Sequence, residues 1–263
     1  MKLDNSLHLL KEKFRFIYPF IVVLVGYEML IRIGLLSPNL FPSLLVIGET
    51  FGEMVSDGVI FEHAYLSLHR MLLGYILGAV VGIGIGIAIG AKKILSDTFK
   101  PILSLLISVP TIAWVPILIV ITGIGNTTII LAIFLGSFFP IVYNSIDGAR
   151  SVEKTWLNAA EITGANKKKR FFHVMLPGSL KSIIPGLRLG IGYSWRALVG
   201  AEMLASRTGG LGRMIYGARS YGGVSEMLVG LAIIGILAYS FDSLLMKKLE
   251  ESTIEKWGMV RER

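Results

Sequence analysis

The sequence predicts an all-α membrane protein, a polytopic bundle of six transmembrane helices. Of its 263 residues, 53% are hydrophobic and 17% are charged, an apolar share above that of soluble domains. Six apolar stretches are each close to the roughly 20 residues that a helix needs to cross the hydrocarbon core. These stretches are 16–33, 66–90, 102–121, 127–143, 183–205 and 227–246.

The distribution of basic residues predicts how these helices are oriented. Lys and Arg gather before the first stretch, between the second and third, between the fourth and fifth, and after the sixth, whereas 34–64 has none. By the positive-inside rule, the basic segments and both termini are expected on the cytoplasmic side. The formal charge of +8 therefore indicates topology, with anionic headgroups of the lipid membrane as its partner, and no nucleic acid is expected.

The N-terminal part is expected to keep its first helix, because no small-residue cleavage site follows the apolar run. Glu28 and Arg32 have the i, i+4 spacing and the order of a favourable helical ion pair. Within 43–55, apolar residues recur at helical spacing, and Glu49 and Glu53 lie on the opposite side. They predict an external amphipathic helix on the membrane surface or against the bundle.

The second stretch predicts close packing against another helix. Five of its glycines recur every fourth residue and line one face, which lets a neighbouring backbone approach. These are Gly74, Gly78, Gly82, Gly86 and Gly90.

The third stretch is expected to be kinked, because Pro110 and Pro116 each interrupt the hydrogen bonds of a helix. Such breaks are tolerated where the backbone is buried in protein or lines a water-filled cavity. Trp114, between the two prolines, is therefore a candidate for lining a pathway. The connection at 122–126 is so short that the third and fourth stretches should be antiparallel neighbours.

The segment between the fourth and fifth stretches predicts a docking helix over 152–164. Ser151 is the expected N-cap, and Gly164 the residue that ends the helix. The helix should carry a mainly apolar stripe with no core of its own, so we expect that face to be buried in a partner protein. The stripe consists of Val152, Trp156, Ala159, Ala160 and Thr163.

This segment resembles the signature loop of the permease subunits of ATP-binding cassette (ABC) importers. The family pattern is Glu-Ala-Ala, three residues, Gly, nine residues, Ile-x-Leu-Pro. The matching residues here are Asn158, Ala159, Ala160, Gly164, Val174, Leu176 and Pro177, at the same spacings. Asn158 replaces the usual Glu and loses its charge, and Val174 replaces the usual Ile.

Other segments are similar to the branch of this family that handles nitrate, sulfonates and taurine. They are 67–74 with the glycine-rich stretch, 109–116, 136–151 and 201–203. The resemblance implies three regions. Residues 1–64 hold the first helix and the external helix, 65–246 form a type I ABC importer permease core, and 247–263 form a cytoplasmic tail.

The resemblance also implies the partners of this chain. Two permease copies, expected to be a homodimer, would enclose the pathway beside two ABC ATPase subunits and an extracytoplasmic solute-binding protein. The helix at 152–164 would be the coupling helix that transmits ATPase closure to the spans. The sequence contains no Gly-x4-Gly-Lys-Ser/Thr loop, so ATP and Mg would be bound by the ATPase, with no cofactor bound by this chain.

Charged and polar residues of the fifth stretch are further candidates for the pathway, since charges inside spans are costly. Arg196 with Tyr193 and Ser194 would attract an anionic solute, or Arg196 would pair with another span. Glu202 is a second candidate, too far around the helix from Arg196 for an ideal pair. Arg70 is expected to snorkel or to pair locally.

Two other classes of protein remain as alternatives. A secondary transporter driven by an ion gradient would need acids near the midplane, and only Glu202 and Asp242 are available. A membrane enzyme would need a cluster of acids, histidines or a nucleophile with its base, and the spacing suggests neither catalytic residues nor a metal site. We therefore expect a non-catalytic subunit of a transporter.

Overall fold

The computed structural model describes residues 18–37, 40–246 and 248, and in that part of the chain every element is helical. A first helix covers 18–32. The following elements are α2 (Leu44–Ser56), α3 (Val59–Gly90), α4 (Lys93–Ser108), η1 (Thr111–Trp114), α5 (Val115–Thr122), α6 (Asn126–Ser151), α7 (Lys154–Ile162), α8 (Lys167–Arg170), η2 (Phe171–Met175), α9 (Leu176–Ala205), α10 (Leu211–Ala218), η3 (Arg219–Tyr221), α11 (Val224–Ser240) and η4 (Phe241–Met246).

The described helices confirm a polytopic bundle. They differ in length and in the number of charged residues within their apolar sequences. Val59–Gly90, Asn126–Ser151 and Val224–Leu244 are each long and apolar enough to cross a membrane. Helix α9 has 30 residues, about 45 Å at 1.5 Å per residue. Its apolar sequence is interrupted by the charged residues Lys181, Arg188 and Arg196. The predicted tail at 247–263 lies outside the described residues apart from Lys248.

The predicted third stretch is not one straight helix, because the chain bends there by 92° between α4 and the pair η1–α5. Val109 is extended and Pro110 follows it, the conformation that a proline imposes on its predecessor. The bend at Pro110 is therefore much sharper than the expected kink. Pro116 causes no kink, since it lies in the first turn of α5, where no backbone N–H is needed.

The glycine face of α3 packs on α6 along its whole length, as predicted. Each of the five glycines meets a residue of α6, and these residues are also spaced by four: Ile133, Ser137, Ile141, Ser145 and Ala149. A Cβ placed on Gly74 would lie 2.7 Å from the Cβ of Ile133, and one on Gly90 would lie 2.7 Å from the Cβ of Ala149. Both numberings increase together, so α3 and α6 run parallel.

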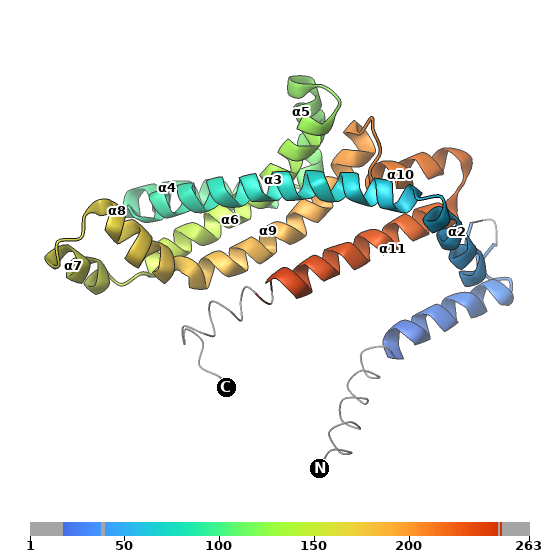
Figure 1. Cartoon of the computed structure of the whole chain (residues 1–263), viewed down its shortest axis with the longest axis horizontal. Helices are drawn as coiled ribbons and strands as arrows, with labels where there is room; N and C mark the ends of the chain where they lie inside the picture. Colours follow the sequence, from blue (N-terminus) through green and yellow to red (C-terminus); the bar gives the residue numbers. More distant parts are fainter. Residues whose placement is uncertain (1–17, 38–39, 247, 249–263) are drawn as a thin grey trace, which may run out of the picture.

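Helix α9 covers another face of α6 and runs antiparallel to it. A Cβ on Gly148 would lie 2.7 Å from the carbonyl oxygen of Ser179, and one on Gly186 would lie 2.6 Å from the Cβ of Asn144. Helices α3, α6 and α9 therefore form a closely packed three-helix unit, seen as the long ribbons that lie side by side in Figure 1.

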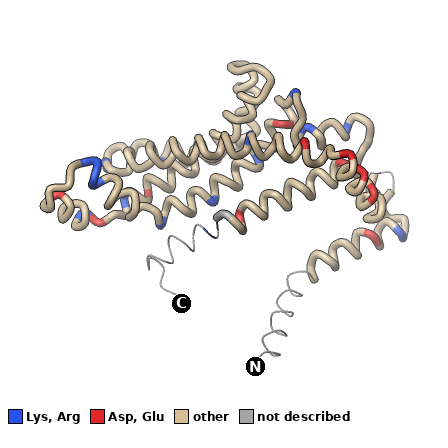
Figure 2. The backbone as a smooth tube through the Cα atoms, viewed as in Figure 1, with Lys and Arg blue, Asp and Glu red and all other residues tan. Residues whose placement is uncertain are grey.

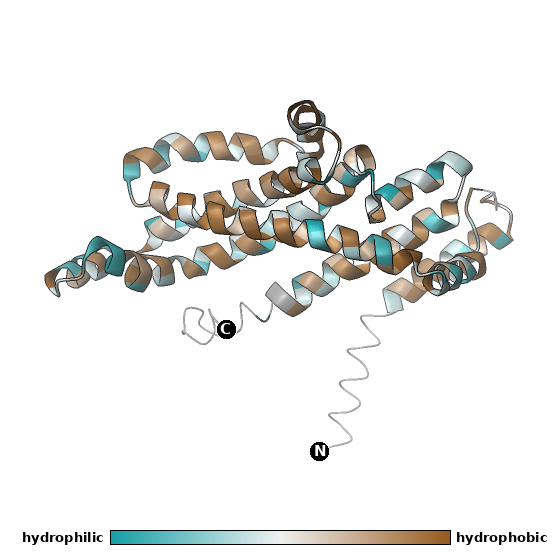
Figure 3. Ribbon diagram, turned by 45° about the horizontal axis from the view of Figure 1, so that its top comes forward, coloured by the Kyte–Doolittle hydropathy of each residue, from teal (hydrophilic) through white to brown (hydrophobic). Residues whose placement is uncertain are grey.

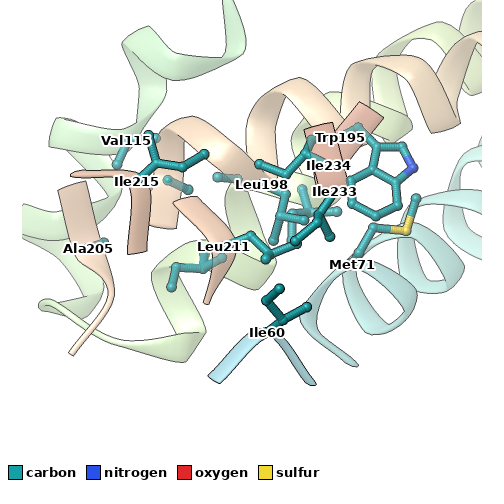
Figure 4. Packing of buried hydrophobic residues seen from close by; sticks show 14 of the residues in the cluster. Ile60, Met71, Val115, Trp195, Leu198, Ala205, Leu211, Ile215, Ile233 and Ile234 are labelled. Atoms are coloured by element: carbon teal, nitrogen blue, oxygen red, sulfur yellow. The ribbon is translucent and has the colours of Figure 1, made fainter. Parts of the chain in front are cut away.

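A hydrophobic cluster joins this unit to the remaining helices near the end that bears α10. Ile60 and Met71 of α3, Trp195 and Leu198 of α9, and Ile233 of α11 are among its buried members. Figure 4 shows side chains from α3, α5, α9, α10 and α11 converging there. The cluster fixes α11 against α9 at this end of the bundle.

The external helix is confirmed as α2, which Ser43 caps by accepting a hydrogen bond from Val46 N at 3.4 Å. The first helix is tied to it through Glu28, whose carboxylate accepts from Leu44 N at 3.0 Å and pairs with Arg32 at 3.0 Å, as expected. Charged residues gather at the two ends of the bundle, with long uncharged stretches between (Figure 2). The middles of α3 and α11 are mainly hydrophobic (Figure 3).

Candidate functional site: a docking helix and a charged cavity

The predicted docking helix exists as α7, but its start differs from the expectation. Ser151 belongs to the last turn of α6, and its Oγ donates to the carbonyl oxygen of Gly148 at 2.8 Å. Glu153 occupies the N-cap position without a side-chain cap. The Ser151 prediction is wrong because α6 continues through that residue before the chain turns.

The end of α7 is as predicted. Gly164 has φ +81°, the left-handed conformation that favours glycine. Its N–H donates to Glu161 O at 3.0 Å, and Ala165 N–H donates to Ala160 O at 2.9 Å. This bond pair is a Schellman motif, which terminates the helix and satisfies carbonyls of its last turn.

The predicted stripe of α7 is largely uncovered. Trp156 is 66% exposed, Ala159 and Thr163 are exposed, and Ala160 is half-buried. Val152 turns inward, where its Cγ2 lies 3.0 Å from the position of a Cβ on Gly178. Asn158 is exposed. In the part of the chain that the structure describes, this face therefore contacts little, as expected of a surface awaiting a partner.

A cavity of about 720 Å³ separates α7 from the start of α9. Its lining includes Trp156 and Ala159 on one side and Val174 and Pro177 on the other. The segment opposite α7 is the single π-helical turn η2, a geometry frequent at functional sites. The two halves of the signature loop thus lie across one cavity.

The loop is mechanically joined to the spans. Leu176, the first residue of α9, packs on the cluster of Ile87, Ala149 and Ile183 from α3, α6 and α9. Arg170 pairs with Glu161 at 2.6 Å and ties α8 to α7. The loop therefore contacts the three-helix unit through Leu176.

The pathway candidates of α9 separate into two groups. Arg196 is exposed and lines a cavity of about 800 Å³ with Tyr193, over whose ring its guanidinium lies at 5.6 Å from the centroid. Trp114 is half-buried against Phe139, and it lines a much smaller hollow that also reaches Tyr193. Ser194 is buried and directed toward Ile133 O at 3.5 Å, so it faces α6.

Glu202 is fully buried and paired with Arg70, whose NH1 lies 2.7 Å from Oε1. Ser67 Oγ donates to the same carboxylate at 2.9 Å, and the N–H of Gly212 donates to Oε2 at 2.9 Å. The expectation that Arg70 snorkels or pairs locally is wrong, since it is 1% exposed and its partner is 132 residues away.

The rest of the Arg70 guanidinium is also bonded. It donates to Asn126 Oδ1 at 2.9 Å, Gly209 O at 2.8 Å and Thr208 Oγ1 at 2.9 Å. We name this group, with Glu202 and Ser67, the outer clamp. It joins α3, α6, α9 and the segment before α10, so Glu202 has a structural place in the bundle.

A second ion pair was missed by the sequence reasoning. Arg188 of α9 pairs with Asp242 of η4, with Nε to Oδ1 and NH2 to Oδ2 both at 2.8 Å. The partners are 54 residues apart, beyond any local spacing rule. Their presence as charges within apolar stretches was the one available signal.

Known proteins show a clear similarity to this chain. Residues 74–249 match the family described as "Binding-protein-dependent transport system inner membrane component". The chain is 32% identical over 225 residues to the taurine transport system permease protein TauC of Escherichia coli, covering 83% of this chain and 81% of that protein.

Two further relatives cover similar shares. The putative aliphatic sulfonates transport permease protein SsuC of Bacillus subtilis is 33% identical over 231 residues, covering 87% of this chain and 83% of that protein. The nitrate import permease protein NrtB of Synechocystis is 33% identical over 201 residues, covering 76% of this chain and 73% of that protein.

The inward-facing MetNI methionine ABC transporter has a chain of similar structure, with a TM-score of 0.61, 19% sequence identity, and coverage of 74% of this chain and 95% of that one. This likeness shows the fold, which is that of a type I ABC importer permease. With the family match over most of the chain, the outcome is plain: this protein belongs to the inner membrane components of binding-protein-dependent transport systems.

Proposed function

We propose that this chain is the permease subunit of an ABC importer and that α7 couples it to a separate ATPase. The observation that carries the proposal is the uncovered stripe of α7, which stands over a cavity at the basic end of the bundle. Its two alanines permit close seating in a partner groove. Leu176 and Pro177 then pass the movement of the ATPase pair to the spans as a rigid-body motion.

The pathway in this proposal runs along the face of α9 that bears Tyr193 and Arg196. A second copy of this chain encloses it, and an extracytoplasmic binding protein delivers the solute. The named relatives import taurine, aliphatic sulfonates and nitrate. A small solute, anionic or heterocyclic, fits that resemblance, and the exposed cation of Arg196 favours the anionic kind.

This chain itself is non-catalytic in the proposal. ATP and Mg are bound by the ATPase, and this subunit converts closure of that ATPase into opening of the pathway. Mutual bias of the ATP sites and the solute path through α7 gives the coupling its allosteric character.

Charged substitution on α7 tests the proposal. Ala159→Arg or Ala160→Arg places a long cation in the docking face, and we expect co-purification of the ATPase to fall at least about tenfold. Thr98→Arg, exposed on α4 at the same end of the bundle, is the matched control and should leave association intact. Unchanged association and unchanged uptake in both alanine variants would remove the basis of the proposal.

The alternative of a secondary transporter gains no support from Glu202, one of the two acids that it would use. Glu202 is held by Arg70 and two further donors, and Asp242 is held by Arg188. An acid that binds and releases a coupling ion needs to be reachable, and the carboxylate of Glu202 is fully buried.

A further inference from the structure

The cavity of about 800 Å³ between η1, α9 and η4 is bordered by charged side chains. Its lining is mainly apolar, and its charged members are Arg188, Arg196 and Asp242. Asp242 neutralises Arg188, whereas no salt bridge among the described residues includes Arg196. The cavity therefore has an excess of one positive charge per chain, which favours an anion.

The two arginines are arranged in sequence along the path. They are eight residues apart on one helix, a rise of roughly 12 Å. Helix α9 begins at the signature loop and ends beside the outer clamp, so a solute moving toward the loop passes Arg196 first and Arg188 second. The pair forms two successive positions for one anionic group.

The second position is already occupied by an internal anion. The guanidinium of Arg188 holds Asp242 by two parallel contacts of 2.8 Å, the geometry that this group also offers to other planar or tetrahedral oxyanions. Arg188 is 47% exposed and Asp242 is 37% exposed, so neither is sealed from the cavity. An anionic ligand at this point must compete with Asp242.

The segment that carries Asp242 contacts α9 through an aromatic pair as well as through the ion pair. Phe241 packs edge-on against Trp195, with ring centroids 5.9 Å apart. Asp242 lies in the π-helical η4, where the hydrogen bonding departs from that of an α-helix. Replacing one partner of this ion pair by a ligand would loosen η4 from α9.

Trp195 adds an unused donor at the same cavity. Its side chain contributes to the lining and is 4% exposed, and its Nε1 has no hydrogen-bond partner among the described residues. A buried N–H without an acceptor is unfavourable. Because Nε1 is itself enclosed, a solute in the cavity would reach it only if the wall around Trp195 moved.

We propose that Asp242 is a built-in competitor for Arg188 in a two-step anion relay. A small solute with one compact anionic group, such as a sulfonate or nitrate, binds first at Arg196 and then displaces Asp242 from Arg188. Competition by Asp242 keeps the second position weak, as transport requires of a site that must also release its solute. The relay rests on the proposed importer function and adds to it the order of the two steps and the role of the acid.

Binding measurements on the permease with its ATPase in lipid nanodiscs, without the binding protein, test the relay. The probe is radiolabelled taurine, with nitrate as competitor and ethanolamine, which lacks the sulfonate, as the negative control. Asp242→Asn should bind taurine about tenfold more tightly than the unmodified chain and should slow uptake in proteoliposomes. Arg196→Leu should lose binding, and Arg188→Gln should cancel the gain of Asp242→Asn when the two are combined.

Asp97→Asn is the matched control, since Asp97 also pairs with a partly exposed arginine, Arg150 at 2.7 Å, but lies outside the cavity. It should leave binding unchanged. Equal affinity of Asp242→Asn and the unmodified chain overturns the relay, as does weaker binding, which would mean that the pair only holds two helices together. Absence of taurine and nitrate binding in every variant also overturns the relay. If Ala159→Arg still loses its association with the ATPase in that case, the importer assignment stands although the relay does not.

Discussion

Helix α9 carries two ion pairs whose surroundings differ, and the difference separates a structural role from a functional one. The outer clamp at Glu202 is closed to solvent, and the Arg70 guanidinium also donates to Asn126, Thr208 and Gly209. The pair of Arg188 and Asp242 is partly exposed and borders a cavity. Since removing one partner of a buried pair leaves an uncompensated charge, the clamp is fixed, whereas the second pair can exchange partners.

The comparison also assigns the two ends of the bundle. At the clamp, the ion pair of Arg70 and Glu202 and the hydrogen bonds around it join α3, α6, α9 and the segment before α10. At the opposite end, α7 and η2 are joined to the spans through Leu176 and its neighbours while the stripe of α7 stays uncovered. Helix α9 thus connects the end that holds the buried clamp to the end that carries the uncovered stripe of α7.

The largest effect is expected from breaking the clamp. Glu202→Ala strands the Arg70 charge in the interior, and it should lower the free energy of unfolding by about 3–5 kcal/mol. Thermal unfolding of the purified protein in detergent measures this. The double variant Arg70→Met with Glu202→Ala should recover much of the loss, and a single variant as stable as the unmodified chain would contradict the structural role.

A smaller effect is expected at the second pair. Arg188→Gln should cost about 1 kcal/mol, because solvent screens a pair that is nearly half exposed. The same unfolding assay applies, with the anion absent. A cost equal to that of Glu202→Ala would erase the distinction between the two pairs and with it the exchange of partners at Asp242.

The smallest effect is expected at the pair of Arg150 and Asp97, which joins α6 to α4 at the basic end. Asp97→Asn should change the free energy of unfolding by less than about 1 kcal/mol, as exposed ion pairs do. It sharpens the comparison by giving the baseline for an arginine pair that does not line the cavity of Arg188. A larger loss would show that exposure alone does not rank these pairs.

Several elements of the site could be predicted from sequence because their determinants are local. Gly164 ends α7 since glycine accepts a left-handed conformation without strain, and Ser43 caps α2 since its hydroxyl reaches an N–H three residues on. The four-residue glycine repeat predicted close packing correctly, because one helical face has a fixed period. The prediction that Ser151 is the N-cap failed because α6 extends to that residue, and the length of α6 decides which residues remain for the loop.

The sequence by itself determined the all-helical membrane fold, the family, the glycine face and the position of helix α7, since each depends on composition or on spacing within one segment. Only the tertiary structure decided the 92° bend at Pro110, the partner of Glu202 and the pairing of Arg188 with Asp242. The physical reason is distance along the chain. Charges that are 132 and 54 residues apart meet only after the helices have packed, and no periodicity of a single segment encodes that meeting.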